Sequence, residues 1–147
     1  MEIERKFTVK ELPDLSQYHY HIMEQGYLNI NPVVRVRKED DNYYLTYKGK
    51  GLLAREEYNL PLNQEAYCHL VEKSDGIIIR KKRYLIPFDK YTIELDVFDA
   101  PYENLIIAEV EFDSKEEAMT FQPPEWFHED VTLNPKYHNS YLSQRFF

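Results

Sequence analysis

The sequence predicts a mainly β fold, with some α content, whose antiparallel strands form an open sheet, a sandwich or a closed barrel. Eight segments alternate apolar and polar residues, as strands with one buried face do. Short turn-like segments join most of them, which favours antiparallel pairing. The chain also holds thirteen tyrosines, and aromatic residues are enriched in strands.

The strands are expected at residues 2–9, 19–28, 33–38, 43–48, 53–60, 77–86, 91–98 and 105–112. Turn residues lie between several of them, at Asn31-Pro32, residues 39–42, residues 49–51 and residues 87–89. Successive side chains of a strand point to opposite faces, so each strand here has a polar face and a more apolar one.

Helical pieces are expected at residues 10–18 (a turn or short helix), 63–73, 114–121 and 135–142, with a brief extended piece at residues 131–132. Ser114 begins an N-cap signature, and Pro135 suits a first helical position. Gly76 fits the end of the second piece. We find no internal repeat, low-complexity tract or linker, so residues 1–147 are expected to form a single domain.

Bulk properties narrow the class of protein. The net charge of −8 argues against general binding to nucleic acid or to an anionic membrane. No apolar run reaches the roughly 18 residues of a membrane helix, and the first residues lack a signal-peptide pattern. The lone Cys68 excludes an intrachain disulfide and suits a reducing compartment. We expect a cytoplasmic protein, monomeric or homodimeric.

Fourteen charged residues share the polar face: Glu2, Glu4, Lys6, Arg35, Arg37, Lys48, Arg55, Glu57, Lys81, Arg83, Glu94, Asp96, Glu109 and Glu111. Seven are acids and seven are bases, although the whole chain is strongly acidic. The first, seventh and eighth strands supply most of the acids, and the third, fourth and sixth supply most of the bases. A closed barrel with this face inward would set an acidic sector against a basic one.

An ordinary solvated face is the alternative, because antiparallel sheets commonly expose one polar side to water. The alternation fits both arrangements equally well, and residues 80–83 carry charge on both faces of their strand. Burying so many charges costs free energy unless they are paired, hydrated or bound to ions. A function would explain that cost.

The residue types indicate which ligand such a lumen would hold. Carboxylates without His or Cys partners suit a hard cation such as Mg²⁺ or Mn²⁺. Arginine and lysine suit phosphate, and six or more bases exceed what a monophosphate requires. A linear polyphosphate or a nucleoside triphosphate fits better, which indicates phosphoryl or nucleotidyl chemistry.

The chain resembles the CYTH domains, also called triphosphate tunnel metalloenzymes, whose hallmark is an N-terminal Glu-x-Glu-x-Lys as in residues 2–6. Matching segments follow in order at residues 25–28, 34–37, 45–50, 55–57, 81–84, 93–98, 108–112, 129–132 and 137–139. The ordered set covers essentially the whole chain. The resemblance implies an eight-stranded antiparallel closed tunnel barrel with a few short flanking helices.

The resemblance also implies site roles. The metal ligands, direct or through water, would be Glu2, Glu4, Asp96, Glu109 and Glu111, with Mg²⁺ or Mn²⁺ as the ion. The triphosphate would contact Lys6, Arg35, Arg37, Lys48, Arg55, Arg83 and Lys136. Lys81 would orient or deprotonate the attacking water, beside Glu2 and Glu4 as catalytic residues. Glu57 and Glu94 would be further tunnel acids, and His138 replaces the usual basic residue before Asn139.

The implied reaction is hydrolysis of inorganic triphosphate to diphosphate and phosphate. Alternatives on the same fold are an adenylate cyclase and a thiamine or nucleoside triphosphatase. A non-catalytic polyphosphate-binding module is an alternative of another class.

Overall fold

The computed structural model describes residues 1–144, which form one large antiparallel sheet with short helices around and inside it. The strands are β1 (Glu2–Val9), β2 (Tyr20–Ile30), β3 (Val33–Glu39), β4 (Asn42–Lys48), β5 (Ala54–Arg55), β6 (Glu57–Leu62), β7 (Asp75–Phe88), β8 (Tyr91–Phe98), β9 (Ile106–Glu111) and β10 (Phe127–Asp130). Nine of them follow the hydrogen-bonded order β10-β1-β9-β8-β7-β2-β3-β4-β6, and β5 pairs with β1.

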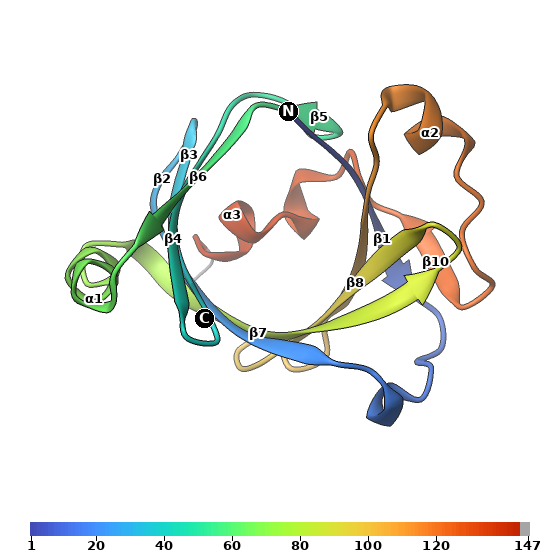
Figure 1. Ribbon diagram of the computed structural model, residues 1–147, viewed down its shortest axis with the longest axis horizontal. Coiled ribbons are helices and arrows are strands. Elements are labelled where there is room, and N and C mark those ends of the chain that lie inside the picture. The colour runs from blue at the N-terminus through green and yellow to red at the C-terminus, as the bar shows by residue number, and fades with distance from the viewer. Residues whose placement is uncertain (145–147) are drawn as a thin grey trace.

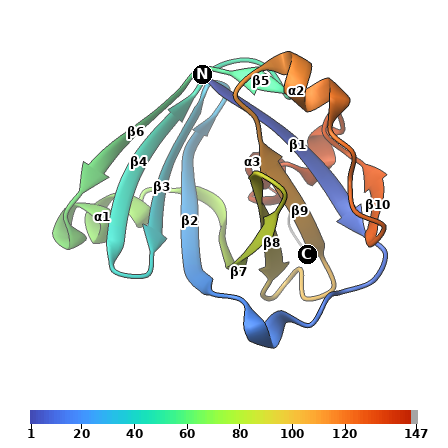
Figure 2. The same cartoon turned by 45° about the vertical axis from the view of Figure 1, so that its right-hand side comes forward.

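The sheet curves round into a barrel, with β1 facing β6 and β5 across the seam (Figures 1 and 2). β6 pairs with β4, and the preceding β5 pairs with β1 by placing Arg55 opposite Glu2. The chain itself therefore bridges the seam, where no continuous ladder joins β6 to β1 within residues 1–144. The predicted tunnel fold is confirmed, with closure through β5 instead of an unbroken hydrogen-bonded ring.

The helices are η1 (Leu15–Gln17), α1 (Gln64–Val71), α2 (Lys115–Thr120), η2 (Pro135–Tyr137) and α3 (Asn139–Leu142). Asn63 and Ser114 cap α1 and α2, since their side-chain oxygens accept hydrogen bonds from the Ala66 and Glu117 amides. α1 packs outside the barrel, whereas α3 lies within the ring of strands (Figure 1). None of the helices in the described part of the chain has the length and apolarity to cross a membrane.

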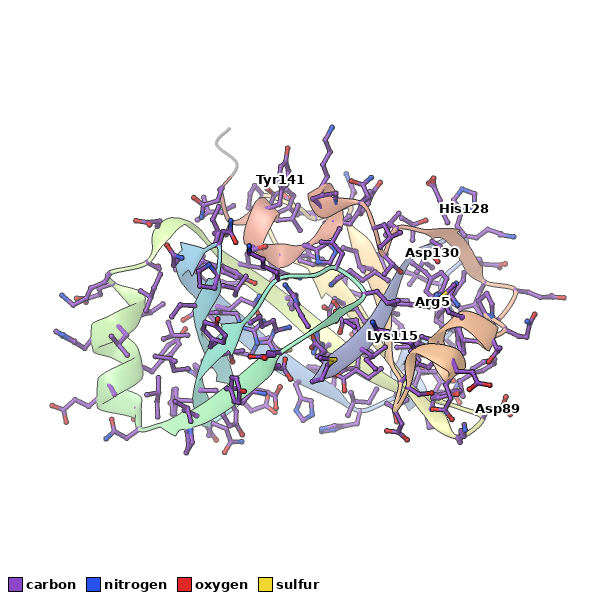
Figure 3. All side chains as sticks on the ribbon, turned by 90° about the horizontal axis from the view of Figure 1, so that it is seen from above. Arg5, Asp89, Lys115, His128, Asp130 and Tyr141 are labelled. Atoms are coloured by element: carbon purple, nitrogen blue, oxygen red, sulfur yellow. The ribbon has the colours of Figure 1, made fainter. Side chains whose placement is uncertain are left out.

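The larger hydrophobic core lies outside the lumen. Phe7, Leu95 and Val110 project from β1, β8 and β9 on the face opposite to the charged residues, and they pack with Phe121 and Phe127. α2 covers this apolar layer with Ala118, and β10, which pairs with β1, adds Phe127 to it. Arg5 and Asp130, which form an ion pair at 2.9 Å, lie together on this outer side (Figure 3).

A smaller apolar cluster lies inside the barrel. Ile79, Phe98 and Ile107 are on the inward faces of their strands, and they contact Leu142 of α3. The carbonyl of Ser143 also accepts a hydrogen bond from the Ile77 amide at 2.7 Å. The C-terminal segment is therefore packed into the lumen, where it fills one part and leaves another part polar.

Three predicted elements differ in detail. The strand expected at residues 53–60 is divided at Glu56, because the chain changes its partner from β1 to β4. The helix expected at residues 135–142 is interrupted at His138, whose backbone is extended. The extended piece expected at residues 131–132 lies earlier, in β10, where it pairs with β1.

Candidate functional site

A polar cavity of about 190 Å³ occupies the lumen. Twelve of the fourteen predicted charged residues line it: Glu2, Glu4, Lys6, Arg35, Arg37, Lys48, Arg55, Glu57, Arg83, Glu94, Glu109 and Glu111. Its few other lining residues include Tyr27, Val33, His138, Asn139 and Ser140. The choice between a solvated face and an enclosed one is thereby settled, because most of these charges are buried.

Strand register brings the charges together from distant parts of the sequence. Glu4 lies opposite Glu111 and Lys6 opposite Glu109, where β1 pairs with β9. Glu109 also lies opposite Glu94 of β8. Since neighbouring strands are about 5 Å apart, side chains in register on one face touch.

Arg83 is the centre of the ion-pair network. Its guanidinium donates from Nε and Nη2 to the two oxygens of Asp96 at 2.8 and 2.9 Å, and Nη2 also reaches Glu109 at 2.7 Å. Nη1 contacts Glu94 at 3.2 Å. Burial opposes the charge, but Asp96 and the two glutamates raise the pKa of Arg83 above its ordinary value.

Lys6 holds a second set of carboxylates. Its Nζ donates to Glu109 and lies 3.5 Å from Glu4. Burial opposes the charge of Lys6, yet the two glutamates raise its pKa. Burial raises the pKa of Glu4, and Glu109 raises it further.

Lys48 and Arg55 form a third set around Glu2. Lys48 Nζ donates to both oxygens of Glu2 at 3.1 Å and lies 3.3 Å from Glu57. Arg55 Nε lies 3.5 Å from Glu2. Glu2 is therefore shared between two bases at the seam of the barrel.

Arg35 and Arg37 have no carboxylate partner among the described residues. Arg35 is 5% exposed, its Nε has no hydrogen-bond partner there, and its Nη2 has only a long contact of 3.4 Å to Thr46. Arg37 Nε donates to Gln25 at 2.8 Å, and burial, then Arg35 and Arg83, lowers the pKa of Arg37 to about 9. A buried and a half-buried guanidinium group that both lack a counter-charge make a site for an anion.

Glu2, Glu4 and Glu111 form an acidic cluster in another part of the cavity. One oxygen from each lies within 4.8 Å of the others. Burial, then repulsion from Glu94 and Glu4 among others, raises the pKa of Glu111 to about 7. Three carboxylates that repel one another, with oxygen donors only, fit a hard divalent cation such as Mg²⁺ or Mn²⁺. Glu109 is engaged with Lys6 and Arg83 instead.

The anion site and the acidic cluster lie toward different openings. Glu2, Glu57, Glu94 and Glu111 also line an outer cavity of about 540 Å³, whereas Arg35 and Arg37 also line one of about 180 Å³. A polyanion in the central cavity could therefore contact unpaired cations along one part and cation-binding acids along another.

Two of the predicted site residues lie outside the cavity lining. Lys81 and Asp96 are 1% and 0% exposed and do not line the cavity. Lys81 Nζ donates to Asp96 at 2.7 Å and to Asn139 at 3.0 Å, and both Asp96 oxygens also accept from Arg83. Asp96 is thus the counter-ion of two buried bases, and Lys81 does not contact the cavity directly; the metal-ligand role of Asp96 and the catalytic role of Lys81 stay predictions.

Lys136 also lies outside the cavity lining. It lies exposed on η2 and is not among the residues that line the cavity. His138, two residues later, is 4% exposed and does line it. His138 has an extended backbone, and its side chain lines the cavity where that of Lys136 does not; the substrate contact of Lys136 stays a prediction.

Sequence reasoning missed seven residues that line the cavity: Tyr27, Val33, Glu39, Asn59, Asn139, Ser140 and, as a lining residue, His138. Tyr27 follows the alternation of β2, which is a usable signal. Asn139 and Ser140 come from a helix that packs into the lumen, and no local pattern indicates where such a helix docks. The pKa of His138 is lowered to about 4 by burial and then by Lys6, so its imidazole is neutral at pH 7.

Known proteins share the sequence pattern and the fold of this chain. A family model described as the CYTH domain matches residues 1–144. Two curated relatives, both called inorganic triphosphatase, are 37% identical to it. The match to the relative from Nitrosomonas europaea covers 97% of this chain and 96% of the relative. The match to the relative from Acetivibrio thermocellus covers 96% of this chain and 92% of the relative. A crystal structure described as that of an inorganic triphosphatase superimposes with a TM-score of 0.74 at 33% identity, covering 99% of this chain and 96% of the other.

Proposed function

The chain belongs to the CYTH domain family, and from that premise we propose that it is a divalent-metal-dependent inorganic triphosphatase. The observation that carries the proposal is a single lumen that holds both an anion site without counter-charges and a separate carboxylate cluster. The two relatives named as inorganic triphosphatases, similar over nearly their whole length, support the same activity.

The substrate would lie along the basic side of the lumen. Arg35 and Arg37 offer uncompensated donors for phosphate oxygens, and Arg37 is already oriented by Gln25. Lys6, Lys48, Arg55 and Arg83 are held in place by carboxylates, so they lose little conformational freedom when phosphate oxygens approach. Such preorganised donors stabilise charge that develops during phosphoryl transfer.

Glu2, Glu4 and Glu111 would hold Mg²⁺ or Mn²⁺. When bound, the cation neutralises charge on phosphate oxygens and polarises them for displacement. Glu57 and Glu94, at the same side of the lumen, keep Lys48 and Arg83 oriented. In the overall reaction, water attacks a terminal phosphorus, the bridging P–O bond breaks, and diphosphate leaves.

The cavity also bears on substrate class. Its lining consists of charged and polar side chains with Val33 as the main apolar exception, so it offers little surface on which a base or another ring could be buried. An inorganic chain of phosphates needs no such surface, because all of it can contact the charged and polar side chains that line the cavity. The small-molecule partner is therefore proposed to be tripolyphosphate.

The test is phosphate release by purified protein from tripolyphosphate, ATP and thiamine triphosphate, each with Mg²⁺ or Mn²⁺. We expect tripolyphosphate to give the highest kcat/KM. A wide preference for ATP, or formation of cyclic AMP from it, would overturn the proposal in favour of a nucleotide enzyme. Tight binding of tripolyphosphate without turnover at any pH or with either metal would indicate a binding module instead.

A further inference from the structure

Asn139 stands between the buried Lys81 and the cavity. It is the first residue of α3, it is 8% exposed, and it lines the cavity, whereas Lys81 does not. The helix that carries it lies within the outline of the ring of strands in Figure 1 and, as Figure 3 shows, at one end of the barrel.

Several contacts fix the position of this helix. Leu142 packs in the inner apolar cluster, and its carbonyl accepts a hydrogen bond from the Tyr102 hydroxyl at 2.7 Å. On the N-terminal side of Asn139, His138 Nε2 donates to the Thr132 carbonyl at 3.0 Å. Asn139 is therefore presented from a rigid support and not from a loose chain end. On the same helix, the exposed Tyr141 points away from the barrel (Figure 3).

The contact with Lys81 determines which way the amide of Asn139 faces. Burial lowers the pKa of Lys81 to about 7, but Asp96, 2.7 Å from Nζ, favours the protonated form. A lysine ammonium only donates hydrogen bonds, so the Asn139 atom 3.0 Å from Nζ is the oxygen Oδ1. The amide nitrogen Nδ2 is then directed away from Lys81, and no hydrogen-bond partner for it is found among residues 1–144. Among residues 1–144, Arg35 Nε is the one fully buried side-chain nitrogen or oxygen that lacks a hydrogen-bond partner. Because Nδ2 of Asn139 also lacks a partner, it is not fully buried and has some exposed surface. The surface that Asn139 presents is part of the cavity lining.

We propose that Asn139 is a further substrate-binding residue, whose Nδ2 donates a hydrogen bond to a phosphate oxygen in the lumen. This inference rests on the proposed function and adds a contact to the same site. The ammonium on Oδ1 polarises the amide and so strengthens Nδ2 as a donor. Lys81 thereby brings positive charge toward the substrate without entering the cavity.

A purely structural role, in which Asn139 only holds Lys81 in place, is the alternative. Asn139→Asp separates the two roles, because aspartate keeps an oxygen for Lys81 but replaces the Nδ2 donor with a second oxygen. Asn139→Ala removes both. Asn63→Asp is the matched control, since it makes the same chemical change at an exposed helix cap, where aspartate caps as well as asparagine.

The measurement is the Kd for tripolyphosphate by calorimetry in EDTA, together with KM and kcat when Mg²⁺ is present. We expect Asn139→Ala to raise Kd about 10- to 100-fold, the loss typical of a hydrogen bond to a charged group. Asn139→Asp should raise it more, since an anionic oxygen would then face the phosphates. Asn63→Asp should leave Kd unchanged, and urea unfolding checks that each variant is folded.

A wild-type Kd for Asn139→Asp would overturn the inference, because only the contact with Lys81 would then matter. A larger loss for Asn139→Ala than for Asn139→Asp would overturn it as well. If the wild-type protein binds tripolyphosphate but does not hydrolyse it, the proposed activity fails while the comparison of Kd values still decides the role of Asn139. If the wild-type protein does not bind tripolyphosphate, both proposals are wrong.

Discussion

At the scale of single residues, most charges in the lumen have a partner, and the unpartnered ones mark where a ligand would bind. Arg83 and Lys6 each contact two or more carboxylates. Arg35, by contrast, keeps a buried Nε with no partner within residues 1–144. Glu111, which is partly open to solvent, forms no ion pair with any described residue and lies beside Glu2 and Glu4. A native protein tolerates such groups mainly where function requires them.

Glu111→Gln should weaken metal binding. Glutamine keeps the size of the side chain but removes the charge, so the acidic cluster loses one of its three anions. Substitution of a residue that only supports a metal ligand already weakens metal binding about tenfold or more. We therefore expect the activation constant for Mg²⁺ or Mn²⁺ to rise at least about tenfold. Activity measured against metal concentration tests this, with the exposed Glu125→Gln as control.

The same variant has a second, opposite effect. Because burial, and then neighbouring carboxylates, raise the pKa of Glu111 to about 7, its charged form is unfavourable in the folded state. Without metal at pH 8, Glu111→Gln should therefore melt no lower than the wild-type protein. An unchanged metal titration, or a clear loss of metal-free stability, would count against metal binding by the cluster.

His138 should make the protein less stable in mild acid. Its pKa is lowered to about 4 in the folded state, against about 6.5 in an unfolded chain. Between these values the unfolded chain binds more protons, so the free energy of unfolding falls as the pH drops from 6.5 to 4, by at most about 3 kcal/mol. His138→Gln can keep the donor to Thr132 but does not titrate.

The difference between the two proteins isolates the histidine from other titrating groups. Urea unfolding at pH 7 and at pH 4.5 should show a smaller loss of stability for His138→Gln than for the wild type. Equal losses in both proteins would mean that the imidazole is protonated in the folded state as easily as in the unfolded chain.

At the scale of elements, the C-terminal segment completes the site by packing against the start of β7. Gly76 has φ of +69°, and a Cβ atom built there would lie 1.9 Å from the Ser143 carbonyl oxygen. That oxygen is the one that accepts from the Ile77 amide. The position therefore requires glycine both for its backbone conformation and for the close approach of the segment that carries Asn139.

Gly76→Ala should displace this segment. We expect a loss of about 1–3 kcal/mol in the free energy of unfolding from the backbone strain alone, together with reduced turnover of tripolyphosphate. Gly49→Ala is the control, because the nearest atom to an added Cβ there is 3.6 Å away and the stability should change by less than about 0.5 kcal/mol. Equal effects of the two substitutions in urea unfolding would exclude this role for Gly76.

Strand alternation explains how much of the fold and site could be predicted from the sequence. It places Glu4, Lys6 and Arg37 on one face, and the structure puts them in the cavity. Alternation predicts which face of the sheet a side chain lies on, but it does not predict the position of that side chain along the barrel axis. Lys81 and Asp96 share the face yet lie beneath the cavity, beside the inner apolar cluster.

Contacts made by the C-terminal segment could not be predicted in the same way. Asn139 is uncharged and lies in a helix of one turn, so its place in the lumen depends on long-range packing of Leu142. The break at Glu56 is similar, because it depends on which strand meets β5 when the sheet curls. Local patterns specify the strands, whereas the curvature of the whole sheet decides which residues meet.

At the scale of the whole molecule, the chain carries a net charge of −8, while its cavity is lined by six bases and seven acids and is therefore nearly neutral. The excess negative charge is therefore mostly on the outside. Such a distribution disfavours weak attachment of polyanions to the surface and reserves phosphate binding for the lumen. Bound ligand should then stabilise the fold specifically, because unfolding would separate the strands that supply Arg35, Lys6 and Arg83.

Tripolyphosphate should accordingly raise the melting temperature even when EDTA removes metal. At about 100 times Kd, mass action adds about 2.7 kcal/mol, which corresponds to about 5–10 °C for a chain of this size. Orthophosphate at the same concentration should shift it much less, because it can contact only a few of the bases at once. Sulfate at equal ionic strength is the control for general salt effects. If sulfate raised the melting temperature as much as tripolyphosphate does, the lumen would not select a chain of phosphates.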